Sequence, residues 1–324
     1  MQEITGKDRT GRTMPDAGNA PTDAAGTIRA ALIGAGIGAS RTPAMHMAEG
    51  RAQGLAYHYD LIDTAGRPGA DIGALLAEAE AVGCRGVNVT HPFKQAALAH
   101  LDSLSPAAEA VGAVNTVVFE DGRRHGHNTD CWGFAEAFAR ELAEAPREVV
   151  LLLGAGGAGG AVAEALMAQG VGLLLIRDSR QEAAETLAQR LAARHGAARV
   201  EAVSPGTEAL AAAAQRACGL VNATPIGMAS HPGLPLPAAL IRPRHWVADI
   251  VYFPLETELL ATARARGCRV MSGAGMAVFQ AVRAFELFTG CKADPDRMRA
   301  AFEAAGSRQT AGTSGTLSAP REDR

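Results

Sequence analysis

The feature that most constrains the fold of this chain is a glycine-rich loop between an apolar run and an alanine-rich run. Residues 148–153 form a short apolar segment typical of a strand, and Gly154-Ala155-Gly156-Gly157-Ala158-Gly159 follows it directly. Residues 161–169 then have the composition of a helix. A strand, a G-x-G-x-x-G loop and a helix in this order predict a dinucleotide-binding unit, because such a loop brings backbone N–H groups close to a pyrophosphate. A purely structural turn is the alternative interpretation.

Strand-like and helical runs alternate from residue 29 to residue 290, which predicts an α/β fold with a parallel sheet. A chain of 324 residues exceeds one comfortable core, so we expect two domains, with Pro146 at a boundary. The last helix, expected over residues 276–290, returns to the first domain. Residues 1–28 and 306–324 are polar, small and charged, and we expect both to be disordered tails.

Composition excludes several functional classes. A formal net charge of −3 gives no electrostatic case for nucleic acid or an anionic membrane as a partner. The longest apolar stretch, residues 149–163, is too short and too rich in glycine to span a bilayer, and residues 1–28 lack the apolar core of a signal peptide. The five cysteines are scattered and form no C-x-x-C pair, which argues against a disulfide framework or a cysteine metal site and favours the cytoplasm.

Two polar segments upstream of the glycine loop carry the candidate catalytic groups. They are Asn88-Val-Thr90-His-Pro-Phe-Lys94 and Gly126-His-Asn-Thr-Asp130. A lysine and a carboxylate beside a nicotinamide can move the proton of an alcohol while the cofactor moves the hydride. We therefore predict Lys94 and Asp130 as catalytic residues. The alternatives are a solvated surface charge for Lys94 and a helix N-cap for Asp130.

Further polar residues stand where a polyhydroxylated ligand would need donors and acceptors: at predicted strand ends, in the turn after residue 34, after the strand over residues 246–249, and within an apolar helix. These candidates for substrate binding are Ser40, Thr42, Asn88, Thr90, Asn115, Tyr252 and Gln280. His46 and His91 have no obvious carboxylate partner, and we expect structural roles for both.

Asp178 bears on the choice of cofactor. It lies at the end of the strand that follows the glycine-loop helix, where a carboxylate can bind the ribose hydroxyls and repel a 2′-phosphate. This position favours NAD. Arg177 and Arg180 leave NADP open, because either side chain could accept the phosphate, and a solvated N-cap is the structural alternative for Asp178.

At these residues the chain resembles the shikimate dehydrogenase family over residues 33–290. The segments that carry the resemblance, besides the glycine loop and the two polar segments, are Ser40-Arg-Thr42-Pro43, Gly112-Ala-Val-Asn115-Thr, Asn222-Ala-Thr224-Pro-Ile-Gly-Met228 and Gly273-Ala-Gly-Met276. The resemblance implies a substrate domain over residues 29–145 and 272–305, and an inserted Rossmann domain over residues 146–271. It also implies reversible oxidation of the 3-hydroxyl of shikimate or quinate, with Lys94 as acid/base and Asp130 as its partner.

The resemblance extends to the cofactor. It implies that the loop Gly154–Gly159 and the strand end hold the dinucleotide, and that residues of the later loops lie beside the nicotinamide; the residues concerned outside the glycine loop are Asp178, Arg180, Thr224, Ile250, Gly273 and Met276. No metal site is expected, and the oligomeric state is expected to be monomer or homodimer.

Two departures point to one branch of the family. Thr42 stands where the biosynthetic enzymes usually have a second serine, and Asp178-Ser-Arg stands where they usually have N-R-T. Both resemble the NAD-linked quinate/shikimate dehydrogenase branch and suggest a catabolic role. An NADP-linked biosynthetic enzyme, an aminoshikimate-type dehydrogenase and a non-catalytic sensor of these acids remain alternatives; a methylenetetrahydrofolate dehydrogenase would not explain the turn at Ser40.

Overall fold

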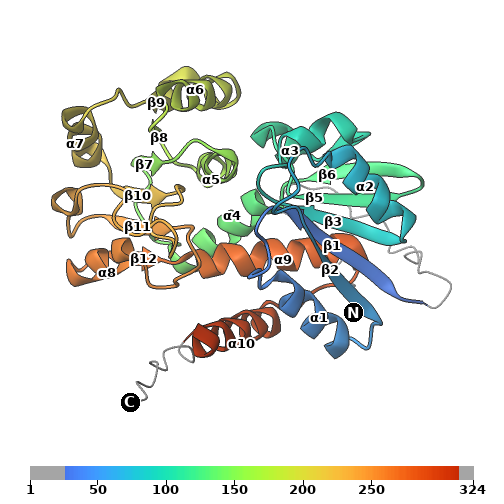
Figure 1. Ribbon diagram of the computed structural model, residues 1–324. Coiled ribbons are helices and arrows are strands. Elements are labelled where there is room, and N and C mark those ends of the chain that lie inside the picture. The colour runs from blue at the N-terminus through green and yellow to red at the C-terminus, as the bar shows by residue number, and fades with distance from the viewer. Residues whose placement is uncertain (1–25, 314–324) are drawn as a thin grey trace, which may run out of the picture.

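The computed structural model describes residues 26–313, with side chains up to residue 307. It contains two α/β domains, each built on a six-stranded sheet (Figure 1). The predicted α/β class with a parallel sheet is confirmed. The N-terminal tail predicted over residues 1–28 lies almost wholly outside the described residues, because the first strand, β1, already begins at Ile28.

The first sheet is mixed and has the strand order β2-β1-β3-β5-β6-β4. Strand β1 pairs in parallel with its neighbours β2 and β3, whereas β5 pairs antiparallel with β3 and β6. The predicted hairpin at Asp121-Gly122 is confirmed, with φ values of 52° and 70° that are typical of a type I′ turn. The elements of this domain are β1 (Ile28–Gly34), α1 (Thr42–Ala52), β2 (Tyr57–Asp63), α2 (Ile72–Ala81), β3 (Cys84–Val89), the 3₁₀ turn η1 (Ala96–His100), β4 (Ser103–Leu104), α3 (Pro106–Val111), β5 (Thr116–Glu120) and β6 (Arg123–His127).

The second sheet is parallel throughout and has the strand order β12-β11-β10-β7-β8-β9. The direction of strand addition reverses between β7 and β10. Ligands of open α/β sheets bind at such a point, beyond the carboxyl ends of the strands. The elements are β7 (Val149–Leu153), α5 (Gly157–Ala168), β8 (Leu173–Arg177), α6 (Gln181–His195), η2 (Ala197–Arg199), β9 (Val200–Ala202), α7 (Thr207–Arg216), β10 (Gly219–Asn222), η3 (Ala238–Leu240), β11 (Trp246–Asp249), α8 (Glu258–Ala265) and β12 (Arg269–Met271).

Two helices join the domains. α4 (Thr129–Glu141) and α9 (Gly273–Thr289) pack along each other between the sheets, and α9 also contacts β1, β3 and β5 (Figure 1). Phe134, Phe138 and Phe279 are buried in this interface. The last part of the chain, which we expected to return to the first domain, contacts strands of the first sheet. The predicted start of the last helix at residue 276 is wrong, because α9 already begins at Gly273.

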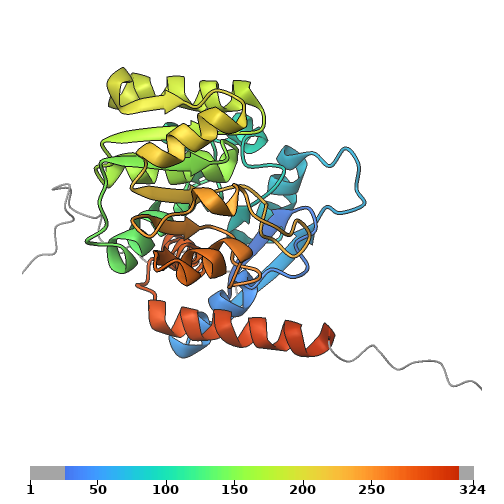
Figure 2. The same ribbon diagram turned by 90° about the vertical axis from the view of Figure 1, so that its left-hand side faces the viewer.

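The sequence did not predict helix α10 (Pro295–Thr313), which continues past residue 306, where a disordered tail was expected. α10 packs on α1 and α9, and Figure 2 shows it running along the outer side of the first domain. Met298 and Phe302, one helical turn apart, are 0% and 1% exposed. Asp294 holds the first turn by accepting hydrogen bonds from the backbone N–H groups of residues 296 and 297 at 2.9 and 3.2 Å. This region is a helix because it gains a packing partner in α1.

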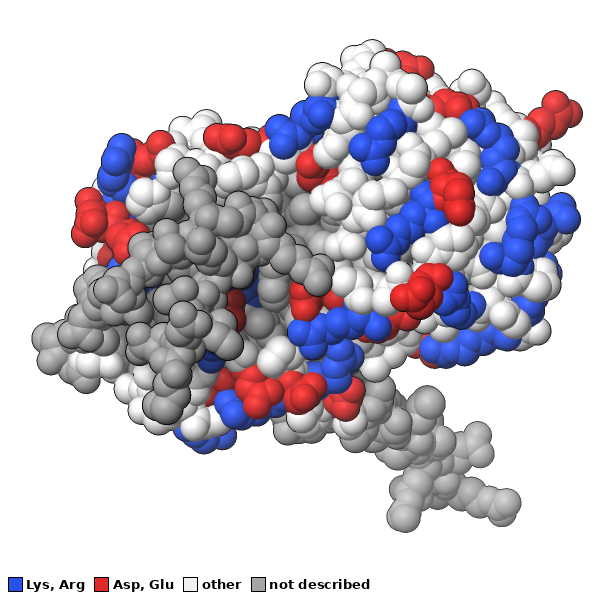
Figure 3. Space-filling view, turned by 180° about the vertical axis from the view of Figure 1, so that it is seen from behind, with Lys and Arg blue, Asp and Glu red and all other residues white. Residues whose placement is uncertain are grey.

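On the face seen in Figure 3, basic and acidic side chains are interspersed over the described surface. Within residues 26–313, none of the helices is both long enough and apolar enough to cross a membrane.

Candidate active site

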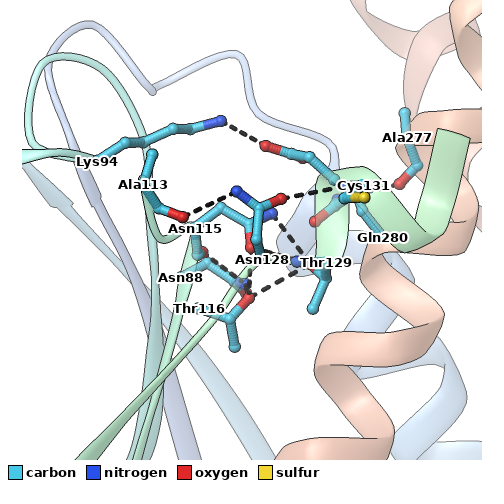
Figure 4. Close-up of polar contacts among 11 residues, drawn as sticks. Asn88, Lys94, Ala113, Asn115, Thr116, Asn128, Thr129, Cys131, Ala277 and Gln280 are labelled. Carbon is cyan, nitrogen blue, oxygen red and sulfur yellow. Dashed lines mark hydrogen bonds and ion pairs between the residues drawn. The ribbon is translucent and has the colours of Figure 1, made fainter. Parts of the chain in front are cut away.

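The two predicted catalytic side chains meet. Lys94 Nζ lies 2.6 Å from Asp130 Oδ2, and the side chains are 21% and 12% exposed (Figure 4). Asp130 lies in the first turn of α4, where the helix dipole favours a negative charge. The alternative in which Asp130 caps this helix is wrong, because Asn128 is the cap and accepts a hydrogen bond from Cys131 N at 3.0 Å.

Lys94 lies in a turn that precedes η1, which begins at Ala96. The Lys94 carbonyl accepts a hydrogen bond from Val114 N at 2.9 Å. This bond ties the lysine backbone to the segment that leads into β5. The Cα position of Lys94 is therefore fixed within the first domain, and its side chain extends from there into the site.

Behind this pair lies a buried network of amides and hydroxyls (Figure 4). Asn115 Oδ1 accepts from Thr129 N at 2.7 Å, and Asn115 Nδ2 donates to Thr129 Oγ1 at 2.9 Å. Asn88 donates to Thr116 Oγ1 at 2.9 Å and to Asn115 O at 3.3 Å, and accepts from the Tyr59 hydroxyl at 2.7 Å. Both N–H groups of Asn88 are used inside the fold, so only its oxygen could serve a ligand, whereas one N–H of Asn115 takes part in none of these bonds.

The turn between β1 and α1 carries Ser40, and Thr42 is the first residue of α1. The backbone of the turn is tied to the loop after β3, because Ala35 N donates to His91 O at 2.9 Å and Thr90 N donates to Ile33 O at 2.9 Å. The structure thereby brings the two predicted segments, at Ser40 and at Thr90, to neighbouring strand ends of one sheet.

Asp63, which the sequence did not single out, organises the start of this turn. Its carboxylate accepts hydrogen bonds from the N–H groups of Ala65 and Gly36 at 2.8 Å and of Ile37 at 3.1 Å. These bonds, that of Ala65 first, lower the pKa of Asp63. No local sequence pattern pointed to this role, because two of the three donors, Gly36 and Ile37, lie 27 and 26 positions away along the chain.

Tyr252 lies in the loop after β11, and its side chain is partly exposed. Loss of water around the hydroxyl raises the pKa of Tyr252, the positive charges of Lys94 and Arg41 oppose that rise, and Asp130 adds to it. The Tyr252 hydroxyl thus shares its surroundings with the Lys94–Asp130 pair. Gln280 is half-buried on α9, and its amide donates to Ala277 O at 3.0 Å (Figure 4).

The two histidines, for both of which we expected structural roles, have different surroundings. His46 is fully buried, and its Nδ1 lies 3.0 Å from the Tyr57 hydroxyl. Its ring centroid is 4.7 Å from that of Tyr59, and burial lowers the pKa of His46 to about 3. His46 is therefore a neutral core residue. His91 is exposed.

The glycine loop has the properties that a pyrophosphate needs. A methyl group on Gly159 would lie 2.1 Å from Gly154 O, whereas one on Gly156 would meet nothing within 4 Å. The helix α5 begins at Gly157 without any side-chain cap on its first N–H groups. Open space and free donors at a helix N-terminus suit a phosphate. The residues present therefore fit a dinucleotide.

Asp178 is fixed beside the loop. Its Oδ2 accepts from Ala155 N at 2.7 Å, and its Oδ1 accepts from Arg180 N at 2.9 Å. Arg177 donates through Nη1 to the Asp178 carbonyl oxygen. Oδ1 also accepts from the Ser179 hydroxyl at 3.4 Å, whereas Oδ2 keeps a further lone pair with which it can accept a hydrogen bond from a ribose hydroxyl.

A second buried network supports the loops that follow β10 and β11. Asn222 Nδ2 donates to Asp249 Oδ1 at 2.9 Å, and Thr257 Oγ1 donates to Asp249 Oδ2 at 2.7 Å. Asn222 Oδ1 accepts from the hydroxyl and the N–H of Thr224, at 2.7 and 3.0 Å. Burial raises the pKa of Asp249. Sequence reasoning did not single out Asn222 or Asp249 as site residues, although a polar residue ends each of these two apolar strands.

The remaining predicted cofactor residues lie around this network. A methyl group on Gly273 would lie 2.4 Å from Ile250 O, so the start of α9 touches the end of β11. Met276 follows in the first turn of α9 and is 7% exposed. The structure thus brings the segments of Thr224, Ile250, Gly273 and Met276 to one edge of the second sheet.

The two halves of the site face each other across the domains. A methyl group on Gly157, at the start of α5, would lie 3.9 Å from Cδ of Lys94. The lysine of the first domain therefore reaches the helix N-terminus at which a dinucleotide would bind. Among residues 26–313, no group of three or more His, Cys, Asp and Glu side chains is placed to hold a metal ion.

Comparison with known proteins agrees with this geometry. A family model described as the shikimate dehydrogenase substrate binding domain matches residues 32–117, and one described as the shikimate 5′-dehydrogenase C-terminal domain matches residues 273–301. A shikimate dehydrogenase (NADP(+)) of Streptomyces avermitilis is 55% identical over 83% of this chain and 91% of its own length. The chain belongs to the shikimate dehydrogenase family.

Relatives with a different cofactor are similar as well. A quinate/shikimate dehydrogenase (NAD(+)) of Corynebacterium efficiens is 48% identical over 85% of this chain and 98% of its own. The solved structure of quinate dehydrogenase from Corynebacterium glutamicum in complex with NAD has a TM-score of 0.81 and 45% identity, and covers 86% of this chain and 99% of that one.

Proposed function

We propose that the protein catalyses the reversible, NAD-linked oxidation of the 3-hydroxyl of shikimate or quinate to 3-dehydroshikimate or 3-dehydroquinate. The observation that carries this proposal is the Lys94–Asp130 pair, closed at 2.6 Å and directed toward the start of α5. An ammonium–carboxylate pair beside a dinucleotide suits alcohol oxidation better than it suits a sensor, which needs no acid/base group.

In the proposed mechanism Lys94 Nζ, in its neutral form, accepts the proton of the substrate's 3-hydroxyl. Asp130 accepts a hydrogen bond from the same hydroxyl or from Lys94, and so orients the oxygen and stabilises the ammonium ion that forms. NAD, when bound, supplies the acceptor for the hydride that leaves the same carbon. In the reverse direction Lys94 is charged and donates the proton to the ketone oxygen.

Binding roles follow from the positions of the side chains. We assign the ring hydroxyls and the carboxylate of the substrate to Ser40, Thr42, Thr90, Asn115, Tyr252 and Gln280, with Asn88 in a supporting role. We assign the pyrophosphate to the loop Gly154–Gly159, the ribose to Asp178 and Arg180, and the nicotinamide to the edge formed by Thr224, Ile250, Gly273 and Met276. These roles imply a substrate domain over residues 29–145 and 272–305 and a cofactor domain over residues 146–271.

NADP is the second candidate cofactor. Arg177 and Arg180 flank Asp178, and a relative named for NADP is 55% identical. We favour NAD because the Asp178 carboxylate, already fixed by two backbone N–H groups, would lie against a 2′-phosphate. The five free thiols support an intracellular reducing environment, and we propose the cytoplasm. A monomer or homodimer is our expectation, which size-exclusion chromatography with light scattering would check.

A matrix of initial rates tests the proposal: shikimate, quinate and aminoshikimate, each with NAD and with NADP. We expect turnover of shikimate or quinate and a higher kcat/KM with NAD. Asp178→Asn should lower kcat/KM for NAD by about 10- to 100-fold, since a hydrogen bond to a charged group contributes about 1.5–3 kcal/mol, while NADP use is unchanged or improved. Higher kcat/KM with NADP in the wild type would contradict the role of Asp178, and no turnover of any acid would contradict the function.

A further inference from the structure

Arg41 stands between the two hydroxyl residues of the substrate turn and has an unusual environment. It is 5% exposed, and its guanidinium carbon lies 5.4 Å from the ring centroid of Phe253 and 4.7 Å from that of Phe302. We call these three residues the Arg41 sandwich. The sandwich joins three separate parts of the chain: the start of α1, the loop after β11 and the helix α10.

Among the side chains of residues 26–307, Arg41 has no counter-ion. Arg41 Nη1 is buried without a hydrogen-bond partner, and no carboxylate of the described chain forms an ion pair with the guanidinium. Burial lowers the pKa of Arg41, and the one group that opposes this effect is Tyr252. A buried, unpaired cation is costly, and cation–π contacts offset only part of that cost. The position would therefore be stabilised by an anionic ligand.

The sandwich borders the substrate site through Tyr252. The rings of Tyr252 and Phe302 form an edge-to-face contact with centroids 6.1 Å apart, and Phe253 is the next residue of the same loop. The positive charges of Arg41 and Lys94 both act on the Tyr252 hydroxyl. Helix α10 packs closely against the guanidinium at Gly306, where an added methyl group would lie 2.6 Å from the guanidinium carbon.

We propose that Arg41 determines specificity for a substrate that carries a carboxylate. Its buried charge raises the positive potential at Tyr252, and the sandwich positions Tyr252 so that the hydroxyl meets the carboxylate group of the substrate. Arg41 is thus a positioning residue that does not contact the reacting carbon. This inference rests on the proposed function, because shikimate and quinate are both carboxylates, and it gives α10 a role in substrate selection.

The test compares the acid with its methyl ester, which keeps the ring hydroxyls and lacks the charge. For Arg41→Gln we expect KM for the acid to rise about tenfold or more, with kcat changed less than about twofold and KM for the ester unchanged. Arg41→Lys, which keeps the charge, should restore most of the affinity for the acid. Equal losses on acid and ester would mean a structural role only and would overturn the proposal, as would an unchanged KM for the acid.

Gly306→Ala provides a second variant in case Arg41→Gln does not fold. Alanine is the better helix former, so the melting temperature should be preserved or raised, while the added methyl group displaces the guanidinium. We expect KM for the acid to rise several-fold, and an unchanged KM would contradict the proposal. Calorimetric binding of acid and ester to the wild type and to Arg41→Gln measures the same selectivity without turnover. Failure of the wild type to oxidise either acid would instead count against the proposed function.

Discussion

The second domain provides backbone N–H groups for a ligand, whereas the first domain provides side chains. At the end of β7 the free N–H groups of α5 and the open space beside Gly156 make the site. At the ends of β1 and β3 the site consists of hydroxyl, amide and ammonium groups, held by the buried network of Asn88 and Asn115. The cofactor half, built from backbone N–H groups, depends on glycines that leave room for the ligand. The substrate half, built from side chains, depends on the functional groups that those side chains carry. The two halves should therefore fail in different ways when they are mutated.

The largest expected effect is on the side-chain half. Lys94→Ala should lower kcat by about 10²- to 10⁴-fold, the usual contribution of a general acid/base. Because Lys94 belongs to the first domain, the Kd for NADH, measured by fluorescence, should stay near the wild-type value. Turnover at the wild-type rate would contradict the catalytic role, and a large loss of NADH affinity would contradict the separation of the two halves.

The backbone half is tested by a matched pair of glycine variants. Gly159→Ala places a methyl group 2.1 Å from Gly154 O and should destabilise the fold by about 1–3 kcal/mol, as overpacking does. Gly156→Ala meets no protein atom within 4 Å, so its free energy of unfolding should change by less than about 0.5 kcal/mol.

Both glycine variants should bind NAD at least about tenfold more weakly, a cost of about 1.4 kcal/mol. Denaturant unfolding and calorimetry separate the two effects. If Gly156→Ala bound NAD normally, the pyrophosphate would have to lie elsewhere.

At neutral pH the smallest effect is expected in the core of the first domain, because it develops only as the pH is lowered. The pKa of His46 is about 3 in the fold and about 6.5 in an unfolded chain, so between these values only the unfolded state binds the proton. Stability from this residue is complete above pH 6.5 and falls, as pH is lowered toward 3, by about 1.4 kcal/mol per pH unit. His46→Asn should remove that slope from urea unfolding measured at pH 4.5 to 7. An unchanged slope would contradict a neutral buried His46.

The same contrast explains what could be predicted from the sequence. The cofactor half could be predicted because it requires glycines at a fixed spacing after an apolar strand, and the strand predicted over residues 246–249 is β11. The pairing of Lys94 with Asp130 followed from residue types and family resemblance. Thr116, Thr129 and Asp63 were missed, because their partners come from strands and turns that are neighbours only in the folded chain.

Helix α10 escaped prediction for a similar reason. Residues 295–313 are rich in alanine, glycine and arginine, and their helical state depends on burying Met298 and Phe302 against the first domain. Two local signals were present: the Asp294-Pro295 start, which suits a helix N-terminus, and the spacing of these two apolar residues. The alternative of Asp130 as the N-cap of α4 was wrong for a local reason, since Asn128, two residues earlier, caps the helix instead.

The central claim is that the two halves assemble around one reacting carbon, and a crystal structure of the protein with NAD and shikimate tests it most directly. We predict that Lys94 Nζ lies within about 3.2 Å of the 3-hydroxyl oxygen, the range for proton transfer. Carbon 4 of the nicotinamide should lie about 3–3.5 Å from ring carbon 3. A substrate bound with another hydroxyl or its carboxylate at Lys94, or with ring carbon 3 out of reach of the nicotinamide, would contradict the account.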